Sequence, residues 1–123
     1  MKNFLFLGSV YAFLGVAFGA FGAHALDKRL LALGTVEIYK TAVHYHLIHA
    51  VALILVALLY DRLRDKTKVN ACGGLFAAGI LIFSGSLYLY AVSKTLMWAL
   101  ITPMGGLCFL AGWALLALAA IRE

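Results

Sequence analysis

The segment YKTAVHYHLIHAVALILVALLY, residues 39–60, decides the fold. From Val51 to Leu59 every side chain is apolar. In a helix with 1.5 Å of rise per residue, a segment of this length crosses the roughly 30 Å hydrocarbon core of a bilayer. The same segment carries His44, His46 and His49. The sequence therefore predicts a membrane-spanning helix that contains three imidazole groups.

The composition of the whole chain is also that of a membrane protein. Of its 123 residues, 65% are hydrophobic and 12% are charged, whereas a soluble domain has about 45–50% apolar residues. A soluble fold of this size lacks the interior volume to bury so much apolar surface. The net charge is +5, but the basic residues lie at the edges of apolar segments, which argues against nucleic acid as a partner.

Four segments are long and apolar enough to span a bilayer, at about residues 4–25, 39–60, 71–92 and 99–121. No repeat or linker divides the chain, so residues 1–123 are predicted to form a single transmembrane domain. The predicted fold class is all-α, an integral membrane four-helix bundle.

The first segment also resembles a signal peptide, with Lys2 at its start and Ala23-His24-Ala25 near its end. Its apolar run, however, exceeds the about 7–15 residues of the apolar region of a signal peptide. We therefore expect it to be retained.

The connection between the first two spans contains leucines at helical spacing, which predicts a short interfacial helix: Leu26, Leu30 and Leu33. Gly34 is expected to end this helix. Thr35 is expected to cap the next helix, and Glu37 to lie in its first turn, where a carboxylate favours the helix dipole.

The distribution of basic residues predicts the orientation. With four spans, both termini and the loop after residue 60 share one side. Six Lys and Arg residues lie on that side (Lys2, Arg62, Arg64, Lys66, Lys68 and Arg122) and four on the other (Lys28, Arg29, Lys40 and Lys94). The excess places both termini in the cytoplasm.

Small residues are placed for close helix packing, which holds bundles together in lipid. They are Gly8, Gly15, Gly19 and Gly22 in the first span, Gly74 and Ala78 in the third, and Gly105, Gly106 and Gly112 in the fourth. Thr102 and Pro103 are expected to mark the start of the fourth helix, because proline is tolerated best in a first turn. Cys72 and Cys108 have no ligand-like spacing and are expected to be small core residues.

The histidines are separated by their positions on the helix. At 100° per residue, His46 and His49 lie about 60° apart, whereas His44 lies about 160° from His46. Ser84 and Ser86 in the third span lie at about the same depth as His49. We therefore expect His49, together with His46, to form hydrogen bonds across the bundle to Ser84, Ser86 or Tyr88.

Three interpretations of these imidazoles remain open. Neutral imidazoles bonded to hydroxyls can simply hold helices together, and ionisable groups within a membrane also mark ion paths or ligand pockets. His46 and His49 could share a metal with His24 as a third ligand, but no Asp, Glu or Cys lies at the same depth, so no metal and no cofactor are predicted.

The usual enzyme motifs are missing from the sequence, which predicts a protein that is not an enzyme and has no catalytic residues.

Four stretches resemble a known family: GAFGAHAL at 19–26, YHLIHAVALI at 45–54, FSGSLYLYA at 83–91 and ITPMGGLCFLAGWALL at 101–116. They are similar to the YgdD/YwdK-like family of uncharacterised small bacterial inner-membrane proteins, relatives of transmembrane protein 256. The resemblance covers all four spans and implies a multi-pass inner-membrane protein with no established activity. The positions that the resemblance marks are Gly19, Gly22, His24, Tyr45, His49, Ser84, Gly85, Ser86, Tyr88, Thr102, Pro103, Gly105, Gly106, Gly112 and Trp113.

The sequence thus predicts a polar cluster in the outer half of the bundle, made of His24, Tyr45, His46, His49, Ser84, Ser86, Tyr88 and Thr102. The predicted packing positions are Gly15, Gly19, Gly22, Gly85, Pro103, Gly105, Gly106 and Gly112. The predicted function is to handle an ion, a small molecule or a lipid through this cluster. The alternative is a structural or partner-binding module whose polar residues only fix helix packing. Membrane lipids are the expected partners, and a solute path would require a homo-oligomer because four short helices enclose little volume.

Overall fold

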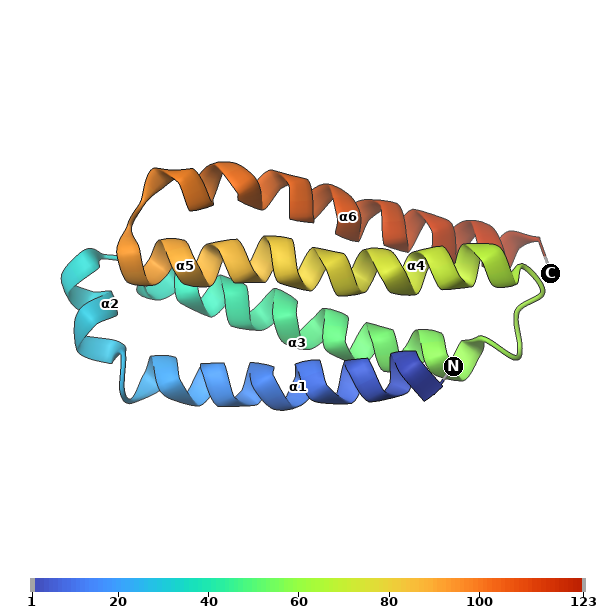
Figure 1. Ribbon diagram of the computed structural model, residues 1–123, viewed down its shortest axis with the longest axis horizontal. Helices are drawn as coiled ribbons and strands as arrows, with labels where there is room; N and C mark the ends of the chain where they lie inside the picture. The colour runs from blue at the N-terminus through green and yellow to red at the C-terminus, as the bar shows by residue number, and fades with distance from the viewer. Residues whose placement is uncertain (1, 123) are drawn as a thin grey trace.

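The computed structural model describes residues 2–122 and contains helices joined by short turns. In chain order these are α1 (Lys2–Ala23), α2 (Asp27–Leu33), α3 (Val36–Leu59), α4 (Lys66–Gly79), the π-helical turn η1 (Ile80–Ser84), α5 (Gly85–Ser93) and α6 (Leu96–Ile121). No strand occurs in this part of the chain. α4, η1 and α5 follow one another without a break, so four long helices run side by side (Figure 1). The predicted all-α fold with four helices able to span a membrane is confirmed.

The central pair of the bundle consists of α3 and the continuous helix α4–η1–α5. α1 packs on α3, and α6 packs along α4, η1 and α5. α1 and α6 lie on opposite sides of this pair and have no direct helix contact within residues 2–122 (Figure 1). Most of the surface of α1 and α6 is therefore exposed, as expected of helices that face lipid.

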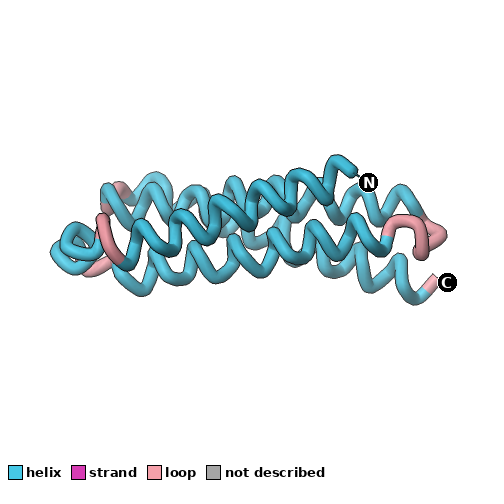
Figure 2. Tube along the Cα trace, turned by 90° about the horizontal axis from the view of Figure 1, so that it is seen from below, coloured by secondary structure: helices cyan, strands magenta, loops and turns pink. Residues whose placement is uncertain are grey.

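The two ends of the bundle differ. Figures 1 and 2 show both ends of the chain and the loop after α3 at one end, with α2 at the other. The third span begins at Lys66 rather than near Ala71 because the Asp65 side chain accepts a 3.0 Å hydrogen bond from the Lys68 backbone N–H and so caps α4. The Lys68 ammonium also bonds to Asp65, and these bonds lower the pKa of that carboxyl. The side of the membrane on which this end lies stays a prediction.

The predicted interfacial helix is present as α2. Gly34 ends it with a φ of 68°, in the left-handed region that glycine adopts easily. Thr35 is the N-cap residue of α3, as predicted, but its side chain makes no capping bond, because its Oγ1 instead donates a 2.6 Å hydrogen bond to the Ala91 carbonyl near the end of α5. Arg29 Nε donates to the next carbonyl, that of Val92, at 2.7 Å. The last carbonyls of a helix have no hydrogen-bond partner within that helix. Arg29 in α2 and Thr35 just after it donate to two such carbonyls and so connect this part of the chain to the end of α5.

Close packing uses only some of the predicted glycines. A methyl group added at Gly105 would lie 2.7 Å from the Phe83 Cα, and one at Gly112 would lie 2.6 Å from the Phe76 ring. The corresponding methyl at Gly15 would meet Leu47, and that at Gly22 would meet the Tyr39 ring. By contrast, Gly85 and Gly74 have no heavy atom within 4 Å of the added carbon, so the packing role expected of them is wrong, while Gly19 and Gly106 make ordinary contacts.

Two further glycines are closely packed but were not predicted to be. Gly73 lies against the Phe4 ring, and Gly79 lies against the Phe109 ring. Of the two cysteines, Cys72 is fully buried, as expected, and Cys108 is half-buried. The spacing of small residues identifies candidate contacts, but the identity of the opposing side chain decides which of them are used.

Pro103 does not mark a helix start, which corrects the sequence prediction. α6 begins at Leu96, directly after the tight turn at Lys94, so Pro103 lies inside the helix. A proline at this position leaves the carbonyl of Ala99 without its helical N–H donor. Here Thr102 Oγ1 lies 2.6 Å from Ser86 Oγ on α5 and also donates to the Trp98 carbonyl at 3.2 Å.

We predict that Gly105→Ala destabilises the bundle and that Gly74→Ala does not. The new methyl at residue 105 would overlap the Phe83 backbone, and such overpacking costs about 1–3 kcal/mol. At residue 74 the space is open, and alanine favours a helix by up to about 1 kcal/mol. Thermal unfolding in detergent measures both, and equal shifts in Tm for the two variants would contradict the packing described.

Candidate functional site

α3 places its three histidines in different environments. His46 and His49 are 3% and 4% exposed, whereas His44 is exposed. His46 faces α1 and α5, while His49 faces α6. The two buried rings therefore occupy separate polar centres on two sides of α3, and not a single cluster.

His46 connects three helices. Its Nε2 lies 2.7 Å from the Tyr11 carbonyl oxygen in α1, and its Nδ1 lies 2.9 Å from the Tyr88 hydroxyl in α5. A carbonyl oxygen only accepts hydrogen bonds, so Nε2 carries the hydrogen and donates it. The Tyr88 hydroxyl then donates to Nδ1. Both nitrogens of the neutral ring are satisfied, and the ring joins α1, α3 and α5.

His49 has the opposite arrangement. Its Nδ1 lies 2.8 Å from the Tyr45 carbonyl oxygen, one turn earlier in α3, and its Nε2 accepts a 3.0 Å hydrogen bond from the Trp113 indole N–H in α6. An indole nitrogen only donates, so Nε2 must be free of hydrogen and Nδ1 must carry it. The ring also stacks on Phe109 at a centroid distance of 3.6 Å. These partners fit only the neutral ring, because a second hydrogen on Nε2 would point at another donor.

Of the bonds predicted across the bundle, the one between His46 and Tyr88 is formed, whereas none of those from His49 to Ser84, Ser86 or Tyr88 is. Ser84 Oγ donates to the Ala42 carbonyl at 2.8 Å, one turn of α3 before His46. Depth alone suggested the pairing with His49, but the rotation of α3 turns this ring toward α6 and away from both serines.

The remaining members of the predicted cluster are dispersed. Ser86 pairs with Thr102 in a separate α5–α6 contact. His24 is exposed in the turn after α1, and Tyr45 is 40% exposed with its ring 4.8 Å from that of Phe83. Within residues 2–122 no group of three His, Cys, Asp or Glu side chains is placed to hold a metal ion.

Two further tyrosines form hydrogen bonds between helices that the sequence did not predict. The Tyr11 hydroxyl donates to the Ala77 carbonyl in α4 at 3.3 Å, and the Tyr39 hydroxyl donates to the Phe18 carbonyl in α1 at 2.5 Å. Their sequence signal was a tyrosine in the middle of one apolar span and another at the start of the next. Every buried side-chain nitrogen and oxygen atom in the described part of the chain has a hydrogen-bond partner. The buried polar groups thus act as bonds between helices.

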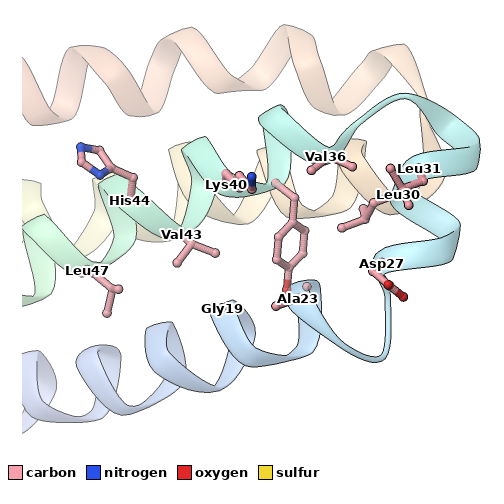
Figure 3. Close-up of a pocket in the computed structure, with 12 residues that line it drawn as sticks. Gly19, Ala23, Asp27, Leu30, Leu31, Val36, Lys40, Val43, His44 and Leu47 are labelled. Atoms are coloured by element: carbon pink, nitrogen blue, oxygen red, sulfur yellow. The ribbon is translucent and has the colours of Figure 1, made fainter.

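A groove of about 530 Å³ lies beside α2, between α1 and α3. Figure 3 shows Val43 and Leu47 pointing from α3 toward α1, where Gly19 and Ala23 form the opposite wall. The apolar lining also includes Tyr39, Leu30, Leu31 and Val36, and two charged residues line the groove as well, Asp27 and Lys40. The His44 ring points away from α1 (Figure 3). A second, smaller groove of about 310 Å³ lies on the other side of Tyr39 and is lined by apolar and aromatic side chains.

We predict that His46→Leu destabilises the protein and that His46→Gln largely preserves it. Leucine leaves the Tyr88 hydroxyl without its partner and removes the bond to the Tyr11 carbonyl, at a cost of about 1–3 kcal/mol, whereas a glutamine amide both donates and accepts. Equilibrium unfolding in mixed micelles measures the difference. Combined with Tyr88→Phe in a double-mutant cycle, His46→Leu should show a coupling of about 0.6–1.7 kcal/mol. Additive effects would show that this contact contributes nothing.

Comparison with known proteins identifies relatives over almost the whole chain. The family described as "Protein of unknown function (DUF423)" matches residues 18–106. The UPF0382 membrane protein YwdK of Bacillus subtilis is 40% identical over 122 residues, which cover 99% of this chain and 98% of the relative. The UPF0382 inner membrane protein YgdD of Escherichia coli K12 is 40% identical over 120 residues, which cover 96% of this chain and 88% of the relative.

A staphylococcal relative agrees with these two. The UPF0382 membrane protein SH2409 of Staphylococcus haemolyticus is 35% identical over 122 residues, which cover 99% of this chain and 98% of the relative. No solved structure matches the chain. Four helices able to span a membrane, together with relatives named as membrane proteins, agree with the family that the sequence resembles. The chain belongs to the DUF423 family of UPF0382 membrane proteins.

Proposed function

We propose that this chain is a lipid-binding membrane protein, that its ligand lies in the groove between α1, α2 and α3, and that the histidine centres hold the helices that form the groove. The observation that carries the proposal is the groove itself. Its volume falls within the range of about 300–1,000 Å³ that is typical of ligand pockets. A mostly apolar lining that includes two charged residues suits an amphiphile, because its acyl chain can contact the apolar residues and its head group the charged ones.

The position of the groove also suits a lipid. It lies at the end of the bundle where α2 covers the helix ends, and it is partly open toward the surroundings. Lys40 is one turn into α3, so it lies close to the expected membrane surface, while Leu47 lies two further turns along. A lipid from the adjoining leaflet can therefore enter sideways with its chain along Val43 and Leu47. With both termini cytoplasmic, as the basic residues predict, this leaflet is the outer one.

The bonds between α1 and α3 support this role, because they fix the two walls. His46 Nε2 and the Tyr39 hydroxyl donate to the α1 carbonyls of Tyr11 and Phe18. Gly15 and Gly22 allow α1 to approach closely at these two points. Gly19 lies between these points, opposite Val43, and both residues line the groove.

An ion or proton path through the histidines is the competing function and has less support. Both nitrogens of His46 and both nitrogens of His49 are engaged by groups of this chain. A relay needs a ring that exchanges hydrogen with a mobile partner, and the carbonyl and indole partners of His49 offer no such exchange. We therefore place ligand recognition at the groove and assign no catalytic step to the protein.

We predict that Val43→Trp reduces lipid binding and that Val51→Trp does not. Val43 lines the groove, whereas Val51, eight residues later in the same helix, is 61% exposed and lies outside it. An indole at residue 43 would occupy the space of an acyl chain, so binding should fall about tenfold or more. Native mass spectrometry of the detergent-purified protein, titrated with dioleoyl phospholipids, counts the bound lipids. Equal lipid adducts on both variants would contradict the proposed site.

A further inference from the structure

We infer that the groove selects a zwitterionic aminophospholipid, with the ammonium of its head group at Asp27 and its phosphate at Lys40. This inference rests on the proposed lipid-binding function and specifies its ligand. It begins from the two charges at the groove, which have opposite signs and come from different elements. Asp27 begins α2, next to the turn that follows α1, and Lys40 lies on α3 (Figure 3).

The Asp27 carboxylate has capacity for a ligand. Its Oδ1 accepts a 2.8 Å hydrogen bond from the Lys28 backbone N–H, and it forms no ion pair with any residue between 2 and 122. An ionised carboxylate has about four acceptor positions. A primary ammonium group, which donates up to three hydrogen bonds, would satisfy the rest through charge-assisted bonds.

Lys40 is held only weakly by its own neighbours. Its Nζ lies 3.6 Å from Glu37 Oε1, and the two side chains are 70% and 87% exposed. Solvent-exposed pairs of this kind contribute little, because water screens them and both side chains lose freedom. A phosphate at the groove would therefore compete well with Glu37 for the Lys40 ammonium.

The pair of charges distinguishes among phospholipid head groups. A purely anionic head group, such as phosphoglycerol, would satisfy Lys40 and be repelled by Asp27. A phosphocholine head group carries both charges, but its quaternary nitrogen has no N–H to donate to the carboxylate. Phosphoethanolamine satisfies both residues. The expected order of affinity is therefore phosphoethanolamine first, phosphocholine second and phosphoglycerol last.

The experiment titrates the full chain in detergent with dioleoyl phosphatidylethanolamine, phosphatidylcholine or phosphatidylglycerol, and native mass spectrometry counts the adducts. We expect about a tenfold preference for phosphatidylethanolamine over phosphatidylglycerol, the size expected for one charge-assisted contact. Asp27→Asn should reduce this preference to less than about twofold while lipid still binds. Lys40→Gln should weaken the binding of all three lipids, because each has a phosphate.

Lys28→Gln is the matched control for charge. Lys28 is the exposed neighbour of Asp27 in α2 and does not line the groove, so its removal should leave the preference unchanged. Equal binding of the three lipids by the unmodified chain would overturn the inference. A preference that Asp27→Asn leaves unchanged, or lipid binding that Lys40→Gln leaves unchanged, would overturn it as well.

Two groove-filling variants test the proposed lipid binding separately from the head-group preference. Val43→Trp narrows the groove from α3, and Ala23→Phe narrows it from α1 at an exposed position that tolerates a larger side chain. If either folded variant loses all adducts while the unmodified chain shows no head-group preference, the lipid site stands and the head-group assignment fails. If both folded variants bind lipid as the unmodified chain does, the lipid site itself fails.

Discussion

The bridge formed by His46 is the interaction on which the rest of the structure depends. In hydrocarbon no water is present to satisfy a polar group, so each buried donor and acceptor needs a partner within the protein. His46 meets this need with a backbone carbonyl in α1 and a hydroxyl in α5. One ring thereby fixes the separation and rotation of three helices that lipid alone would not drive together. Four other hydroxyl groups also donate to a backbone carbonyl of a neighbouring helix, those of Tyr11, Tyr39, Ser84 and Thr35.

The sequence was sufficient for the four spans and the short helix α2, because apolar length and the spacing of leucines are local properties. It was not sufficient for the contacts between spans. Gly74 and Gly73 are neighbours with the same local chemistry, yet only Gly73 meets an opposing ring, that of Phe4. Pro103 suggested a helix start, whereas the chain begins α6 earlier and places the proline beside a pair of hydroxyls. Which glycines pack closely and where the proline lies depend on the side chains that other helices place opposite them.

The polar site shows the same limit. Comparison of depths matched His49 with Ser84 and Ser86, but it contained no information on the rotation of α3 relative to α6. Trp113 supplies the missing partner, and its indole N–H determines which nitrogen of His49 carries hydrogen. With the histidines engaged in helix packing, the groove beside α2 becomes the part of the molecule with unfilled space and available charge. The sequence left the structural and ligand-binding roles as alternatives for one cluster, and we propose that the histidines have the first role and the groove has the second.

The tautomers of the two buried histidines test this account most directly. Nitrogen-15 solid-state NMR of the protein in lipid, with labelled histidine and with His24→Gln and His44→Gln removing the two exposed rings, reports the protonation of each ring nitrogen. The account predicts two neutral rings of opposite type, with hydrogen on Nε2 of His46 and on Nδ1 of His49 at neutral pH. Doubly protonated rings, or the same tautomer at both positions, would contradict it, because the Tyr11 carbonyl and the Trp113 indole could not then be their partners.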